Sequence, residues 1–277
     1  MEHPKVRRLY KYAAFNARSI SALVTGKLWF ASACTFNDPF DCALVDNSQV
    51  LTAERERHAQ KLLLQHPSTK SRDRVERDIN AALGKVSRKF FNHVVERDKA
   101  LLEPFSEIHK QLQSLLYKFG VLSLSATARS VLMWSHYGGQ HTGMCFEFER
   151  SSENSLGKDA MPVKYSSARI GKMSPDIDPP QNPLFAKYNG WRYEREWRLL
   201  AKPCNQLHDF PGELKAIVCG ARMSQPDIDA LTKIVESLNL GRPDPIKLRF
   251  AKMDSQKYQI KIGAVRQRTV ESAAVVE

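Results

Sequence analysis

The 277-residue chain has few cysteines and no long hydrophobic run. Its five cysteines are widely spaced and form no Cys-x-x-Cys pair, which argues against a disulfide scaffold or a zinc ribbon. Such cysteine use favours a reducing, cytoplasmic location. No stretch reaches the roughly 18 apolar residues of a membrane span, and the charged N-terminal segment lacks the apolar core of a secretion signal. We therefore expect no membrane association and no cleaved signal.

Several motifs that would identify an enzyme class are also absent. The sequence contains no Gly-x-Gly-x-x-Gly, no phosphate-binding Gly-x-x-x-x-Gly-Lys-Ser/Thr, no His-Glu-x-x-His and no Gly-x-Ser-x-Gly. These absences disfavour a Rossmann dehydrogenase, a P-loop NTPase, a zinc protease of the His-Glu-x-x-His type and a serine hydrolase.

The composition is that of a folded protein with a basic surface. Hydrophobic residues make up 42%, charged residues 26% and aromatic residues 9% of the chain, so a disordered or fibrous chain is excluded. Forty-two Lys and Arg against 30 Asp and Glu give a net charge of +12. This excess favours nucleic acid or another polyanion as a partner, with a protein target as the alternative, and it leaves the oligomeric state open.

The N-terminal part of the chain has clear signals for where its strands and helix begin and end. Residues 9–12 and 27–32 have the pattern of short strands. A helix is predicted between them, starting at Asn16 and stopping at Gly26, because glycine readily ends a helix in a left-handed conformation. Residues 35–41 have the composition of a turn.

Two further zones follow. Residues 51–118 alternate in charge and predict a helical insertion, which we interpret as a solvated lid or brace, with a nucleic-acid-binding face as the alternative. The rest of the chain returns to strands, at residues 120–125, 143–149, 162–165, 194–201, 214–219, 246–251 and 258–262, with helices at 130–137 and from Ser224 and a Pro-rich loop at 174–183. These elements predict an α+β protein: residues 1–277 form a single domain with one mixed or mainly antiparallel sheet and a charged helical insertion.

Residues 191–200 combine two carboxylates, arginines and aromatic rings. If they form a strand, alternation places Glu194, Glu196 and Arg198 on one face. Such a row suits a general base or the stabilisation of a cationic transition state. A cross-strand ion-pair row is the structural alternative.

A second segment, residues 121–143, ends a predicted strand at Ser125 and continues into a short helix with Trp134, His136 and Tyr137. Aromatic faces with hydrogen-bonding tips can build the wall of a pocket, although the same residues also suit a core. His136 and His141 are five residues apart, which is off the spacing of two ligands on one helix face, so no metal site is expected here.

A third segment, residues 36–41, contains Asn37, Asp38 and Asp41. These side chains suit a cation or a ribose. Asn and Asp before proline are also the commonest residues of turns, so the turn is the favoured interpretation and a binding role is the alternative.

These motifs occur in a recognisable order: residues 9–12, 28–32 with 36–41, 120–125, 133–137 and 193–198. Taken together, from about residue 9 to 262, they resemble a widespread bacterial family, the domain-of-unknown-function family 2971. That family name implies no activity.

A more distant resemblance is to the ADP-ribosyltransferase superfold. It implies NAD as a co-substrate, with Glu196 as the carboxylate that polarises the nicotinamide ribose and Glu194 as the group that activates the acceptor. The residues that it implies for NAD binding are Tyr12, Ser125 or Ser32, Trp134, His136, Tyr137 and Arg198.

The sequence is therefore compatible with three functions. The first is an NAD-consuming transferase or hydrolase, such as a toxin or defence effector acting on nucleic acid or protein. The second is a non-enzymatic nucleic-acid or protein-binding module, with stacking platforms at Trp29, Trp134, Trp191 and Trp197. The third is a metal-dependent nuclease using Asp38, Asp41, Glu194 and Glu196.

Overall fold

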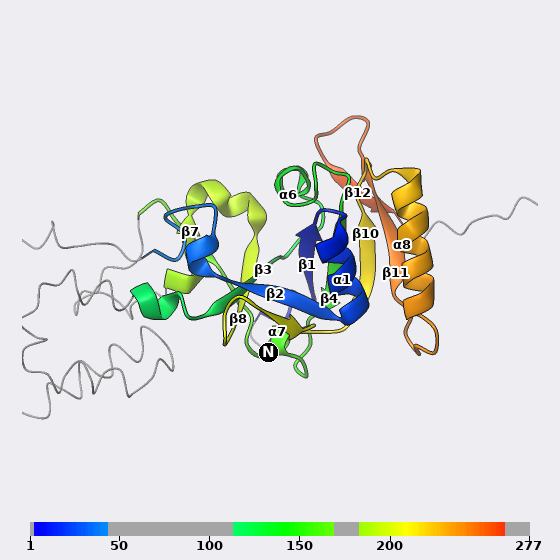
Figure 1. Ribbon diagram of the computed structural model, residues 1–277. Coiled ribbons are helices and arrows are strands. Elements are labelled where there is room, and N and C mark those ends of the chain that lie inside the picture. Colours follow the sequence, from blue (N-terminus) through cyan, green and yellow to red (C-terminus); the bar gives the residue numbers. More distant parts are fainter. Residues whose placement is uncertain (1–2, 44–112, 169–182, 264–277) are drawn as a thin grey trace, which may run out of the picture.

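The computed structural model describes residues 3–43, 113–168 and 183–263 (Figure 1). Residues 51–112 of the predicted insertion and 174–182 of the predicted loop lie outside the described residues. The strands are β1 (Arg8–Ala13), β2 (Lys27–Ser32), β3 (Gly120–Ser125), β4 (Met144–Glu149), β5 (Met161–Pro162), β6 (Lys164–Ser166), β7 (Ala186–Tyr188), β8 (Glu196–Ala201), β9 (Gln206–Asp209), β10 (Leu214–Cys219), β11 (Lys247–Met253) and β12 (Ile260–Gly263). The helices are α1 (Ala17–Thr25), α6 (Val131–His136), α7 (Ser155–Lys158) and α8 (Gln225–Leu238), with 3-10 helices at Ala33–Thr35, Pro183–Phe185 and Asn189–Glu194.

One large sheet organises the molecule. Its strands follow the order β12-β11-β10-β4-β1-β3-β2-β9, and β8 pairs with β3 and β5. Within the described residues, β10 and β11 form a parallel pair and the other pairs of this sheet are antiparallel. The predicted α+β class with one mainly antiparallel sheet is confirmed. Every helix in the described ranges is too short or too polar to cross a bilayer.

Helix ends follow their local sequence signals. The Asn16 side chain accepts a hydrogen bond from the Ser19 backbone N–H and caps α1, and Gly26 ends the helix with φ 67°, as predicted. At α8, the Ser224 side chain accepts a hydrogen bond from the backbone N–H of Asp227, and proline occupies the first turn.

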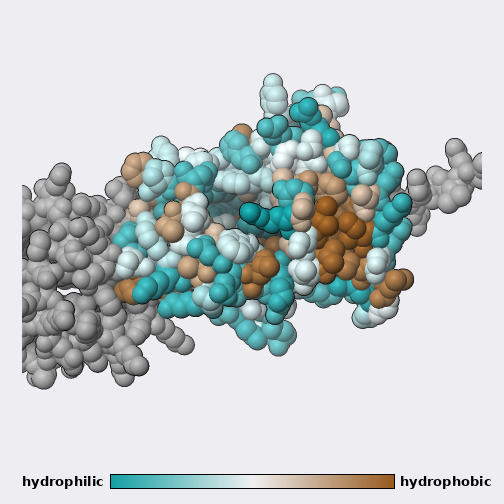
Figure 2. Space-filling model, in the orientation of Figure 1, coloured by the Kyte–Doolittle hydropathy of each residue, from teal (hydrophilic) through white to brown (hydrophobic). Residues whose placement is uncertain are grey.

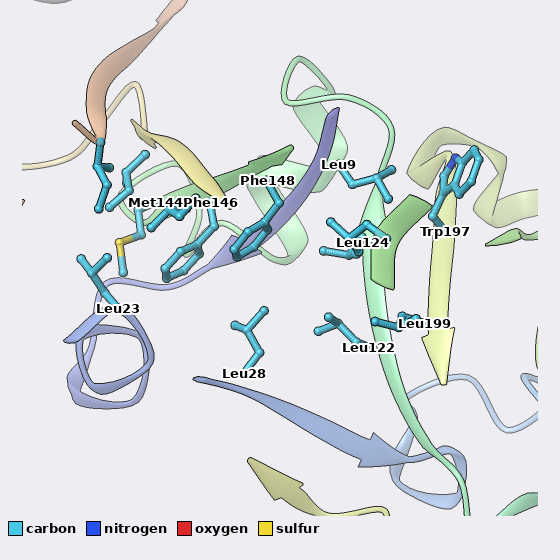
Figure 3. Packing of buried hydrophobic residues seen from close by; sticks show 14 of the residues in the cluster. Leu9, Leu23, Leu28, Leu122, Leu124, Met144, Phe146, Phe148, Trp197 and Leu199 are labelled. Atoms are coloured by element: carbon cyan, nitrogen blue, oxygen red, sulfur yellow. The ribbon is translucent and has the colours of Figure 1, made fainter. Parts of the chain in front are cut away.

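The main core lies on one face of the sheet (Figure 3). Leu122 and Leu124 of β3 pack there with Phe146 and Phe148 of β4, since alternate residues of a strand share a face. Leu23 of α1 is buried in the same cluster. On the surface, hydrophobic side chains gather between α1 and α8, while much of the rest of this view is hydrophilic (Figure 2).

The opposite face is covered in part by α6. Trp134 is fully buried there, and its ring meets that of Tyr12 edge-on at 5.1 Å. Next to this contact, β1 and β3 are paired only through Tyr10 and Ser125. Residues of both strands line a cavity near this single pair, so the sheet itself provides a wall for a site.

The strands predicted at 246–251 and 258–262 are observed with shifted ends, as Lys247–Met253 and Ile260–Gly263, and two other predicted strands differ in organisation. The strand expected from residue 194 begins at Glu196, because residues Asn189–Glu194 form a 3-10 helix and Arg195 turns the chain with φ 47°. The alternation predicted for this segment therefore holds only within β8, where Trp197 packs into the core and Glu196 faces the cavity. The single strand predicted at 162–165 is instead two short strands, because β5 pairs with β8 whereas β6 pairs with β7.

Candidate functional site

A cavity of about 200 Å³ lies where β1, β3 and the start of β8 meet. Its walls also include α6, β7 and the segment that follows β2. The lining residues are Tyr10, Lys11, Tyr12, Phe36, Asn37, Asp41, Ser123, Leu124, Ser125, Met133, Tyr137, Lys187, Glu194 and Glu196. The three segments that the sequence singled out thus contribute to one cavity.

Lys187 of β7 is the centre of a buried charge cluster. Its Nζ lies 2.6 Å from Glu194 Oε2, 3.1 Å from Glu196 Oε2 and 3.4 Å from Asp41 Oδ2. Burial alone would lower the pKa of Lys187, but Glu196, Asp41 and Glu194 outweigh that effect and raise it. The ammonium therefore stays charged and holds the three carboxylates together.

Arg198 supports this cluster from inside the protein. Its Nη2 donates to Asp41 Oδ2 at 2.7 Å and its Nε donates to Glu196 Oε1 at 2.8 Å. The arginine side chain is fully buried and does not line the cavity. Arg198 thus orients Glu196 and ties β8 to the segment after β2.

The two glutamates differ in protonation behaviour. Burial raises the pKa of Glu194, although Lys187 and the Tyr137 hydroxyl, which donates to Oε1 at 2.8 Å, oppose this shift. Burial would also raise the pKa of Glu196, but the charges of Arg198 and then Lys187 outweigh this effect and lower that pKa to about 2. One cavity therefore holds a carboxylate that stays ionised beside one that takes up a proton more readily, a pattern typical of acid–base sites.

Tyr12 and Ser125 lie on the same cavity, but their hydroxyls are used internally. Tyr12 Oη donates to the Thr127 carbonyl at 2.8 Å, and Ser125 Oγ donates to the Glu194 carbonyl at 2.6 Å. Ser125 thereby fixes the backbone of Glu194. Both residues shape the wall, and Ser125 also positions Glu194.

Three of the predicted NAD-binding residues besides Arg198 lie away from the lining. Ser32 is buried and donates to the Tyr117 carbonyl at 2.7 Å. Trp134 is a core residue whose Nε1 donates to the Ala128 carbonyl. His136 is exposed, and its Nδ1 lies 3.0 Å from Tyr193 Oη. Of the alternatives Ser125 and Ser32, only Ser125 reaches the cavity.

The structure also corrects part of the predicted set of stacking tryptophans and part of the predicted set of metal-binding carboxylates. Trp134 and Trp197 are buried, so two of the four tryptophans present no surface for stacking. Asp38 does not line the cavity, and it accepts hydrogen bonds from Trp191 Nε1 at 2.8 Å and from the Phe40 N–H. A Lys187 ammonium lies between the other three carboxylates, and no cluster of potential metal ligands occurs among the described residues.

Sequence reasoning missed Tyr10, Lys11 and Lys187 as lining residues. Lys11 was visible as a charge between two tyrosines of strand β1, where its Nζ donates to the Ser123 carbonyl at 2.9 Å. Burial lowers the pKa of Lys11. Lys187 had no such signal, because β7 is only three residues long.

The comparisons with known proteins cover part of this site. No curated protein and no solved structure matches the chain. Residues 133–199 match the model of a family described as a protein of unknown function (DUF2971). The matched segment runs from α6 to β8 and contains Tyr137, Lys187, Glu194 and Glu196 of the cavity. In this segment the chain is therefore similar to that family, whose description states no activity.

Proposed function

We propose that this protein transfers ADP-ribose from NAD to water or to an acceptor, in the manner of an ADP-ribosyltransferase. The observation that carries the proposal is the pair of glutamates, Glu194 and Glu196, which line one cavity with opposite pKa shifts. In this reaction the C1′–N bond breaks and nicotinamide leaves with the bonding electrons. An acceptor O–H or N–H forms the new bond to C1′ and gives up its proton.

Glu196 suits the stabilisation of the sugar cation. Cleavage of the glycosidic bond develops positive charge on the ribose, so a nearby carboxylate is attracted more strongly in the transition state than in the ground state. Glu196 remains ionised, and its bonds to Arg198 fix its orientation before the substrate binds. A preorganised charge of this kind needs little rearrangement during the reaction.

Glu194 suits proton transfer from the acceptor. A general base works best when its pKa lies close to the operating pH, and burial moves Glu194 in that direction. The hydrogen bonds from Tyr137 and Lys187 hold both of its oxygens in place.

The size of the cavity limits how much of NAD it can take. Sites for whole small-molecule ligands usually measure about 300–1,000 Å³. The cavity of about 200 Å³ is therefore matched to the reacting sugar and its base, with the remainder of the dinucleotide outside it. A nucleic-acid or protein acceptor would approach the same opening. The net charge of +12 favours nucleic acid, and a toxin or defence effector would use such chemistry.

Nicotinamide release from NAD tests the proposal. Purified protein is incubated with NAD alone, with DNA or RNA, and with cell extract, beside the variants Glu196→Gln and Glu194→Gln. We expect each substitution to reduce release by about 100-fold or more, because each removes a charge that acts in the transition state. The exposed Glu153→Gln is the matched control and should retain wild-type release. Absence of release under all conditions would overturn the proposal in favour of a non-enzymatic binding module.

A further inference from the structure

A second charged group lies on the same sheet face as the cavity. Glu147 of β4 is 1% exposed, and each of its carboxylate oxygens accepts from a different arginine. Arg8 Nη1 donates to Oε1, and Arg249 Nη1 donates to Oε2 at 3.1 Å. The two arginine side chains are 40% and 34% exposed, so each reaches the surface.

This group carries an excess positive charge. Two guanidiniums surround one carboxylate, which leaves a charge of +1 at the surface between β1 and β11. Glu149 is the register partner of Arg8, but its carboxylate lies 3.2 Å from Lys215 Nζ. Paired arginines held in a fixed geometry match the oxygens of a phosphate, since each guanidinium can donate two parallel hydrogen bonds.

Strand pairing connects the arginines to the cavity. In the strand pairing, Glu196 lies opposite Ser125, and Ser125 lies opposite Tyr10 on its other side. Tyr10 in turn lies opposite Glu147. Register partners in antiparallel strands share a face, so these four residues form one row across β8, β3, β1 and β4. With strands about 4.8 Å apart, the row spans about 14 Å.

Tyr10 is the link between the two groups. It lines the cavity, and the charges of Glu147, Arg8 and Arg249 all act on its hydroxyl. Tyr10 therefore lies in this row between the cavity residue Ser125 and the arginine-bound Glu147.

We propose that Arg8 and Arg249, held by the buried Glu147, bind the diphosphate group of a nucleotide whose ribose occupies the glutamate cavity. The sugar half of this proposal rests on the proposed glycosyl transfer, whereas the phosphate half does not. The substrate class is thus a pyrophosphate-bearing nucleotide.

Binding of ADP, measured by isothermal titration calorimetry, tests the phosphate half. Arg8→Gln and Arg249→Gln should each weaken the Kd for ADP by about tenfold, because each removes charge-assisted hydrogen bonds to phosphate. Each single variant leaves Glu147 paired with the other arginine, which preserves the fold. Arg7→Gln removes the same charge from an exposed neighbouring residue and should change the Kd less than twofold.

Arg249→Lys distinguishes a loss of phosphate binding from a loss of folding. It retains a cation for Glu147 and loses the planar fork, so we expect a Kd between those of wild type and Arg249→Gln. Absence of ADP binding, or equal Kd values in all variants, would overturn the proposal. Oligonucleotide binding that depends on Arg8 and Arg249 without ADP binding would also overturn it, in favour of a polynucleotide surface.

The two proposals fail in distinguishable ways. ADP binding that depends on both arginines, with no cleavage of NAD, would retain the phosphate site and reject glycosyl transfer. Cleavage of NAD with an unchanged KM in Arg8→Gln and Arg249→Gln would retain glycosyl transfer and reject the phosphate site.

Discussion

Arg198 and Glu196 form a forked ion pair inside the protein, with Nε donating to Oε1 at 2.8 Å and Nη2 donating to Oε2 at 3.0 Å. Both residues belong to β8 and lie two positions apart, so their side chains share one face. The same guanidinium also bonds Asp41 through Nη2. The pair lies within one strand, so it is not the cross-strand row of the structural interpretation, and of its two members only Glu196 lines the cavity.

Replacing Arg198 should destabilise the protein strongly. Arg198→Met leaves Asp41 and Glu196 buried with only Lys187 as a cation, and breaking a buried ion pair from one side costs about 3–5 kcal/mol. Urea unfolding measures this loss. The exposed Arg192→Met is the control and should change stability by less than about 0.5 kcal/mol. Equal stability of the two variants would contradict the assignment.

The pKa of Glu196 predicts an acid-sensitive contribution to stability. Its folded value of about 2 lies below its usual 4.5, so the ionised group stabilises the fold above pH 4.5, and this contribution is lost as the pH falls toward 2. The contribution is about 3 kcal/mol. The raised pKa of Glu194 acts in the opposite direction, because its protonation favours the folded state as the pH falls.

Urea unfolding at several pH values tests this prediction. The free energy of unfolding of wild type should fall more between pH 4.5 and 2 than that of Glu196→Gln, which has no group to titrate at this position. Parallel pH profiles for the two proteins would show that Glu196 makes no such contribution.

Lys187 should determine whether the carboxylate cluster binds cations. Its ammonium lies within 4 Å of Asp41, Glu194 and Glu196, so we expect EDTA to leave the melting temperature of wild type unchanged. Lys187→Ala brings the three carboxylates together without that cation. Millimolar Ca²⁺ should then raise the melting temperature of the variant by about 2 °C or more.

Lys158→Ala is the matched control for this experiment, because it removes an exposed lysine. It should show no Ca²⁺-dependent change. A Ca²⁺-dependent rise in melting temperature of equal size in wild type would contradict the central role of Lys187 and favour the metal-dependent nuclease.

Gly143 should tolerate no side chain. A Cβ there would lie 2.3 Å from the Ala13 carbonyl oxygen and 2.8 Å from that of Gly138, and both atoms belong to backbone that cannot move freely. Gly143→Ala should therefore destabilise the protein by about 2 kcal/mol or more, measured by thermal unfolding. For Gly263→Ala the nearest atom lies at 3.8 Å, so we expect little change.

Local sequence was sufficient for most of the regular elements. The strands at residues 120–125 and 214–219 match the prediction at both ends, because turns and polar residues bound their apolar runs. Asn16 and Gly26 likewise mark the limits of α1 through short-range capping. The short strand β9 was missed, since its four residues carry no periodic hydrophobic pattern.

Only some of the residues of the candidate site were predictable from the sequence. Glu194 and Glu196 stood out because carboxylates next to apolar and aromatic residues are unusual, and both line the cavity. The position of Glu194 was not predictable, because it depends on the 3-10 helix Asn189–Glu194 and the left-handed Arg195. Strand alternation alone would have placed it in β8.

The class of fold, the capped helices and the polar residues available for chemistry follow from local sequence patterns, since these depend on neighbours within a few positions. The position of Lys187 between Asp41, Glu194 and Glu196 depends on the packing of distant segments, as does the placement of Ser125 rather than Ser32 at the cavity. The same is true of the sharing of Glu147 by Arg8 and Arg249. These contacts join residues far apart in the chain, and the pairing of distant strands leaves no periodic trace in either segment.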